Sequence, residues 1–100
     1  MAKLIVRPVT VQTRFEEYHE RNPEVFELFV QFTREVMRSG YEHYGAWATF
    51  QRIRWHIDME THQRDGFKIS NDYISRYVRM LETVFPEYSG FYKTRPLKVA

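Results

Sequence analysis

The sequence predicts a single, mainly α domain with a small β component: three helices in a winged-helix-like order, with short strands near the N- and C-terminal ends. Two segments, 22–38 and 70–85, combine helix caps with apolar residues at helical spacing. The first residues are β-branched, and a turn near the end precedes a basic stretch. The connection between the second and third helices, about nine residues, is longer than a tight helix-turn-helix uses.

Residues 1–12 are expected to form an extended arm or an edge strand. Their apolar residues alternate weakly, and Pro8 cannot donate a ladder hydrogen bond in a central strand. In the next residues, 13–22, Phe15 and Tyr18 are three apart, so a turn or two of helix is expected there. The helical core is expected over residues 22–86.

The first predicted helix covers residues 23–38. Asn22 is a typical N-cap residue, and Pro23 suits the first helical position because its missing N–H is not needed there. Ser39-Gly40 marks the end as a glycine cap. The apolar residues follow at spacings of four, three and four: Val25, Phe29, Phe32 and Val36.

Residues 46–60 allow two interpretations. As a helix, they place Trp47, Phe50, Ile53 and Ile57 on one face. As a strand, residues 52–60 alternate polar and apolar and would pair with residues 66–69. The length of the segment and the absence of helix breakers favour the helix.

The third predicted helix begins at Ser70 or Asn71 and ends before Pro86, which cannot continue it. Residues 89–100 follow as a basic hairpin or tail, and their strand is expected to pair with the N-terminal one. The buried face of this helix is expected to consist of Ile74, Tyr77, Val78, Leu81 and Phe85.

The amino-acid composition excludes several kinds of protein and of functional site. One hundred residues make one domain, and aromatic residues at 17% supply much buried area for a small core. The absence of cysteine excludes disulfides, thiol nucleophiles and Cys-based zinc sites. A net charge of +2 excludes a DNA mimic. No stretch suits a membrane span or a signal peptide, so we expect a location in the cytoplasm, or in the host cytoplasm for a phage protein.

Chemistry-bearing residues do not combine into a catalytic motif. In a strand, His56, Asp58, Glu60 and His62 would share one face at metal-ligand spacing, whereas in a helix only His56 and Glu60 would. Asp58, Glu60 and Lys68 do not form the acid-any-lysine pattern of a metal-dependent nuclease. No phosphate-binding loop or nucleophile elbow occurs. We therefore expect no enzyme activity, no metal and no cofactor.

Basic residues concentrate in the second half, where residues 50–100 carry nine Lys or Arg against six Asp or Glu. Arg and Asn can read base edges, and Tyr and Lys can contact phosphates. An alternative places Trp55 at the core edge and pairs Arg52 and Arg54 with Glu35, Asp58 or Glu60. The residues expected to bind nucleic acid are Arg52, Arg54, Lys68, Asn71, Tyr73, Arg76, Arg79, Lys93 and Arg95.

Three runs carry a recognisable pattern: FQRIRWHIDMET, GFKISNDYISRYVRML and FPEYSGFYKTR. The pattern resembles that of a group of short proteins common in phages and prophages, over residues 19–95, with Ser70 and Tyr92 as departures. The resemblance implies a phage-type origin and a cytoplasmic role, and supplies no catalytic residues. The matching positions are Arg52, Ile53, Arg54, Trp55, Glu60, Thr61, Phe67, Lys68, Ile69, Asn71, Tyr73, Arg76, Tyr77, Arg79, Phe91, Thr94 and Arg95.

The expected function is that of a small, non-catalytic, phage-type protein that binds double-stranded DNA through its third helix and basic tail. The alternative is a protein-binding modulator or inhibitor of a host complex, such as a polymerase or a defence nuclease. Abundant Tyr, Trp and Arg suit that alternative because these residues anchor protein interfaces. The sequence leaves the oligomeric state open.

Overall fold

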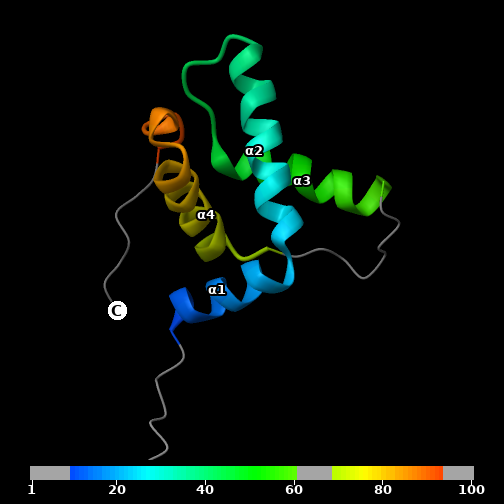
Figure 1. Ribbon diagram of the computed structural model, residues 1–100. Helices are drawn as coiled ribbons and strands as arrows, with labels where there is room; N and C mark the ends of the chain where they lie inside the picture. Colours follow the sequence, from blue (N-terminus) through cyan, green and yellow to red (C-terminus); the bar gives the residue numbers. More distant parts are fainter. Residues whose placement is uncertain (1–9, 61–68, 94–100) are drawn as a thin grey trace, which may run out of the picture.

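A computed structural model describes residues 10–60 and 69–93 of the chain. Those ranges hold four α-helices and one 3₁₀ turn, and no strand (Figure 1). The mainly helical prediction is therefore confirmed. The predicted extended arm or edge strand of residues 1–12 and the basic hairpin or tail of residues 89–100 fall in large part outside the described residues. The elements are α1 (Val11–Arg21), α2 (Pro23–Arg38), α3 (Ala46–Glu60), α4 (Asn71–Val84) and η1 (Pro86–Tyr88).

Helix α1 corrects the prediction of three helices. The sequence assigned Val11 and Gln12 to an extended arm and expected a turn or two of helix after them, whereas the helix already begins at Val11. Thr10 caps it by accepting a hydrogen bond from the Thr13 amide at 3.1 Å. Phe15 is its one buried residue, and its ring meets Tyr77 of α4 edge to face, with centroids 4.7 Å apart. This long-range contact holds α1 in place.

The other helices agree with the sequence. Helix α2 spans Pro23–Arg38, and Gly40 follows it with φ 96°, a conformation that glycine adopts without strain. Asn22 stands at the predicted cap position, but its side-chain amide donates to the Tyr18 carbonyl of α1 at 2.9 Å instead of capping α2. Residues 46–60 are helical, so the strand interpretation was wrong.

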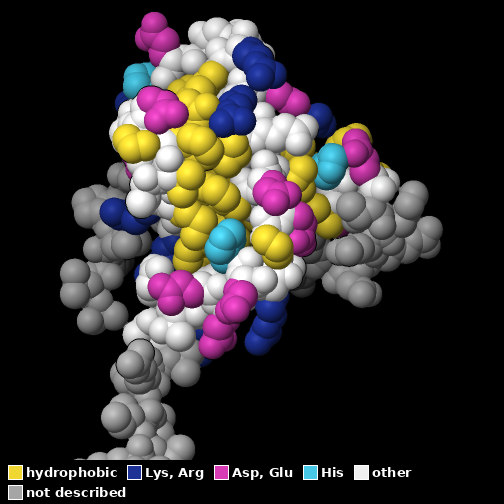
Figure 2. Space-filling view, in the orientation of Figure 1, with side chains coloured by type: hydrophobic (Ala, Val, Ile, Leu, Met, Phe, Trp, Pro, Cys, Tyr) yellow, Lys and Arg dark blue, Asp and Glu magenta, His cyan; other side chains and the backbone are white. Residues whose placement is uncertain are grey.

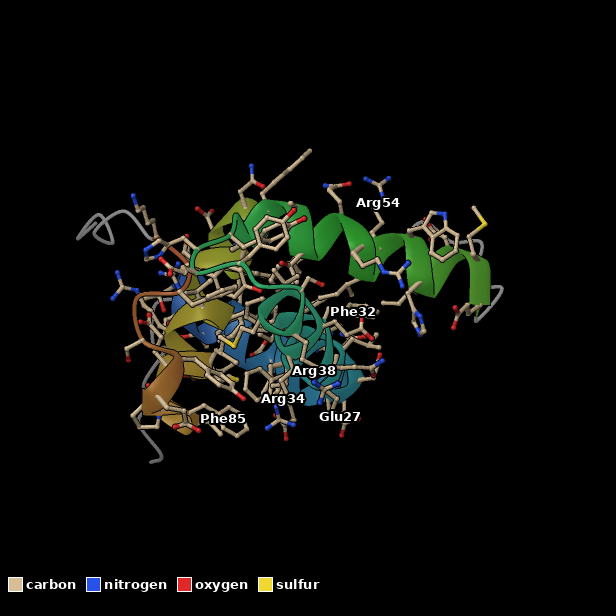
Figure 3. The ribbon with its side chains drawn as sticks, turned by 90° about the horizontal axis from the view of Figure 1, so that it is seen from above. Glu27, Phe32, Arg34, Arg38, Arg54 and Phe85 are labelled. Carbon is tan, nitrogen blue, oxygen red and sulfur yellow. The ribbon has the colours of Figure 1, made fainter. Side chains whose placement is uncertain are left out.

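Helix α4 begins after Ser70, whose hydroxyl accepts from the Asp72 amide at 3.2 Å, and ends before Pro86, as expected. In Figure 1, α2 stands at the centre with α3 crossing behind it, α4 beside it and α1 below. Figure 3 confirms from above that the second half of α3 extends beyond the other helices. The hydrophobic core consists of Phe15, Val25, Phe29, Phe32, Phe50, Ile53, Ile57, Ile74, Tyr77, Val78, Leu81, Phe91 and Tyr92.

Only the first residues of the predicted basic hairpin or tail, 89–93, are described, and two of them enter the core. Phe91 and Tyr92 are buried, and Tyr92 forms an isolated parallel bridge with Tyr44 in the loop before α3. The amide of Tyr44 donates to the Phe91 carbonyl at 3.2 Å. Two adjacent aromatic rings gain more from burial than from exposure on a wing, so the segment enters the core.

The Tyr92 hydroxyl lies between two buried threonines. It is 2.8 Å from the Thr33 hydroxyl of α2 and 3.0 Å from the Thr49 hydroxyl of α3. Thr33 donates its proton to the Phe29 carbonyl at 2.6 Å, so it accepts from Tyr92, which in turn accepts from Thr49. All three hydroxyls are thereby satisfied away from water, as buried polar groups must be.

This chain of hydrogen bonds predicts unequal effects for two conservative changes. Tyr92→Phe leaves the Thr49 donor buried without an acceptor and should cost about 1–3 kcal/mol of unfolding free energy. Tyr77 is equally buried, but its hydroxyl has no hydrogen-bond partner among the described residues. Tyr77→Phe should therefore change stability by less than about 0.5 kcal/mol or increase it. Urea unfolding followed by circular dichroism measures both, and equal losses would contradict the assignment.

Burial also predicts the response to alkali. Burial raises the pKa of the Tyr77 hydroxyl above its usual value, and that of Tyr92 as well, although the hydrogen bonds that Tyr92 makes with Thr33 and Thr49 oppose its shift. The pKa of each hydroxyl is higher in the folded protein than in the unfolded chain, where it is about 10. The neutral, buried tyrosine therefore makes its full contribution to the unfolding free energy below about pH 10, and this contribution is lost as the pH rises through the folded pKa. Above about pH 10, each such tyrosine should lower the unfolding free energy by about 1.4 kcal/mol per pH unit. Urea unfolding at increasing pH should show a shallower loss in Tyr77→Phe than in the wild type, and identical slopes would refute the shift.

Candidate nucleic-acid interface

A groove runs between the first turns of α3 and the N-terminal half of α4. It consists of two adjoining hollows of about 530 and about 230 Å³, which share Trp47, Asn71 and Ile74. Lys93 lines the larger hollow and Arg54 the smaller one. We call this the α3–α4 groove, and its lining residues are Gly45, Ala46, Trp47, Phe50, Gln51, Arg54, Ile69, Asn71, Ile74, Ser75 and Lys93.

The α3 residues that line the groove are spaced so that they lie on one face of the helix. Trp47, Gln51 and Arg54 recur at spacings of four and three, so they form one stripe along α3. The sequence had placed Trp47 on the apolar face with Phe50 and Ile53, but its side chain is 61% exposed, whereas those two are buried. An indole left in water at the mouth of a groove offers a flat apolar surface for a partner.

The electrostatics of the α3–α4 groove are one-sided. Its lining includes the cations Arg54 and Lys93 and no carboxylate. Within residues 10–60 and 69–93 the one ion pair joins His56 and Glu60, so both cations are without an acidic partner there. Guanidinium and ammonium groups bind phosphate, and the amide of Asn71 can reach a base edge. The groove therefore presents positive charge and a side-chain amide without a carboxylate in its lining.

A second groove lies on the other side of α4, against α1. Arg76 and Arg79 line it with Gln12, Met80 and other residues, again without a carboxylate. The two arginines differ, because the Arg76 guanidinium donates to the Gln12 side chain at 3.0 Å and to the Asp72 carbonyl at 3.2 Å. The Arg79 side chain is exposed and has no bond to another described residue. Arg76 therefore ties α4 to α1, while Arg79 is available to a ligand.

Two predicted contact residues lie elsewhere. The sequence placed Tyr73 on the outer side of its helix, but its ring is half-buried against Phe15 and Tyr18 of α1, at 5.9 and 5.2 Å between centroids. Arg52 lies over the rings of Phe32 and Trp55, at 5.0 and 5.4 Å, between α2 and α3. Figure 3 shows Arg54 pointing away from Phe32, on the opposite side of α3.

The nine predicted residues therefore fall into separate groups. Arg54, Asn71 and Lys93 meet in the α3–α4 groove, and Arg76 and Arg79 share the groove against α1. Lys68 and Arg95 lie outside the described residues. Sequence reasoning missed Trp47 and Gln51, although the helical spacing between Trp47 and Arg54 was a signal that could have identified them.

The metal-ligand spacing considered for residues 56–62 depended on a strand. In the helix, His56 Nδ1 lies 3.0 Å from Glu60 Oε2, and His62 is outside the described residues. No group of three His, Cys, Asp or Glu able to hold a metal ion occurs in the described part of the chain. The pairing of Arg52 or Arg54 with Glu35, Asp58 or Glu60 is not found among these residues either.

Comparison of the chain with protein-family models, with curated proteins and with solved structures gives no match. Among the described residues, no helix is both long enough and apolar enough to cross a membrane.

The different surroundings of the α4 side chains predict an order of stability losses. Arg79→Ala should change the unfolding free energy by at most about 0.5 kcal/mol, because the side chain is exposed. Arg76→Ala removes the link to Gln12 and should cost about 0.5–1.5 kcal/mol. Leu81→Ala, at a fully buried position, should cost about 2–5 kcal/mol. Thermal and urea unfolding measure the order, and a large loss in Arg79→Ala would show that this arginine is a structural partner.

Proposed function

We propose that the protein is a small, non-catalytic DNA-binding protein that contacts double-stranded DNA through α4 and the grooves beside it. The observation that carries the proposal is the α3–α4 groove. It combines the exposed indole of Trp47 with two cations, Arg54 and Lys93, that have no acidic partner among the described residues. Cations supply the phosphate contacts that dominate nucleic-acid affinity. The phage-type origin and the cytoplasmic location implied by the sequence resemblance belong to the same proposal.

The arrangement suits a helix that enters the major groove. Helix α4 would direct Asn71 toward base edges from the side of the α3–α4 groove and Arg79 from the side facing α1, since both side chains are exposed. Arg54 and Lys93 would contact phosphates on one side of the helix, and Trp47 would pack on the sugars there. In a winged-helix-like arrangement, the basic tail that begins at Lys93 would have the role of the wing.

Fluorescence anisotropy with a labelled duplex at increasing salt tests this function. The double variant Arg54→Ala, Lys93→Ala should bind at least about tenfold more weakly. It should also reduce the slope of log K against log salt by about two units, one per lost phosphate contact. Arg21→Ala, an exposed arginine of α1 outside both grooves, is the matched control. Unchanged affinity in the folded double variant, or no salt-sensitive binding by the wild type at micromolar concentration, would reject the proposal.

A separate observation favours the protein-binding alternative. Trp55 and Met59 lie one turn apart on the projecting half of α3, with 51% and 57% of their surfaces exposed. Exposed Trp and Met side chains are typical anchors of protein interfaces. A pull-down from host lysate should then recover one stoichiometric partner, resistant to nuclease and lost in the variant Trp55→Ala, Met59→Ala. Recovery that requires nucleic acid would reject this candidate.

A further inference from the structure

The exposed side of α2 carries charges in a definite order. Five exposed side chains recur at spacings of three and four and so form one straight stripe, which we call the α2 stripe. Its first half is acidic, its centre is neutral and its second half is basic. Its members are Glu24, Glu27, Gln31, Arg34 and Arg38.

An apolar band accompanies the α2 stripe. Phe26, Val30 and Met37 of α2 are only partly buried, as is Phe85 after α4. Figure 2 shows hydrophobic side chains in a continuous band down this face, with charged side chains of both signs along its edges. Figure 3 places Glu27, Arg34, Arg38 and Phe85 on the same side of the molecule.

Arg34 connects the charges with the apolar band. Its guanidinium lies 5.1 Å from the centre of the Phe85 ring and donates to the Tyr88 hydroxyl at 3.0 Å. Stacked arginine and aromatic rings of this kind recur at protein interfaces. The nearby Glu35 does not break the charge order, because it lines the pocket between α2 and α3.

The helix dipole explains only part of this pattern. It favours acids in the first turn and bases in the last, which accounts for Glu24 and Arg38. Its effect falls off within one turn, whereas Glu27 and Arg34 lie in the second turn and the penultimate turn. The dipole also gives no reason for apolar side chains to remain partly exposed beside the charges.

We propose that a second copy of this chain packs on the α2 stripe, antiparallel and about a two-fold axis near Gln31. The axis would set Glu24 opposite Arg38 of the partner subunit and Glu27 opposite the partner's Arg34. Parallel packing would instead bring like charges together. An isologous contact requires a face that complements itself, and an order of acid, neutral and base along a straight helix has that property. The apolar bands would then meet beside the charges.

This interface does not depend on the proposed nucleic-acid site. Arg54 lies on the opposite side of the molecule from Arg34 and Arg38 (Figure 3), so pairing through α2 would leave the α3–α4 groove open.

Analytical ultracentrifugation at roughly 1–200 µM protein tests the proposal. The wild type should be a reversible dimer that dissociates more readily at about 500 mM salt than at about 50 mM. Glu24→Arg alone and Arg38→Glu alone should each weaken association at least about tenfold, because each creates two like-charge contacts per dimer. Arg14→Glu, a reversal on the exposed surface of α1, is the control and should have no effect.

Two combinations make the test specific. Mixing the Glu24→Arg chain with the Arg38→Glu chain should restore association, since all facing charges in the heterodimer are then opposite. The double variant Glu24→Arg, Arg38→Glu should also dimerise, although its charges oppose the helix dipole. Circular dichroism confirms that each variant is folded. A wild type that stays monomeric, or a dimer insensitive to these reversals, would overturn the proposal.

Discussion

The phenolic hydroxyl of Tyr92 joins three parts of the chain that are far apart in sequence. Thr33 on α2 and Thr49 on α3 are fully buried. A buried hydroxyl without a hydrogen-bond partner lowers the unfolding free energy of the protein. Because Tyr92 satisfies both, the crossing of α2 and α3 depends on the segment that follows η1. The same anchor holds Lys93, the next residue, at the mouth of the α3–α4 groove. The candidate site is thus built on this polar contact.

Local chemistry explains why most of the helices could be predicted. Pro23 and Ser70 mark helix starts through effects within one helical turn: the fixed φ angle of proline and the hydrogen bond from a backbone amide to the serine hydroxyl. Pro86 ends α4 through an equally local effect, because proline cannot continue a helix. The full length of α1 was not predicted, because Phe15 is its one buried residue and a single buried residue gives no periodic pattern. The burial of Phe91 and Tyr92 was missed because their partners lie on distant helices, and no local signal in the sequence records such contacts.

The sequence indicates which residue types line the candidate site better than it indicates where each side chain points. Arg54, Asn71 and Lys93 line the α3–α4 groove, although they come from three segments. Tyr73 was misplaced, and Arg76 is partly engaged, because α1 covers that flank of α4. Trp47 was misjudged for the opposite reason: its position on α3 matched the apolar face, but none of the described elements covers it. Side-chain direction depends on which neighbours are present, and a single helix pattern does not contain that information.

The Tyr92 contact also has a consequence for the order of folding. Helical domains usually fold fast because most of their contacts are local. Here the hydroxyl contact closes a separation of 59 residues to Thr33, which costs loop entropy before it returns any stability. The helices can therefore collapse first and the C-terminal segment lock last. Release of that segment would leave the Thr49 hydroxyl without its Tyr92 acceptor and remove the contact that joins α2 and α3 through Tyr92. The α3–α4 groove depends on the same segment, because Lys93, the residue after Tyr92, forms part of its lining.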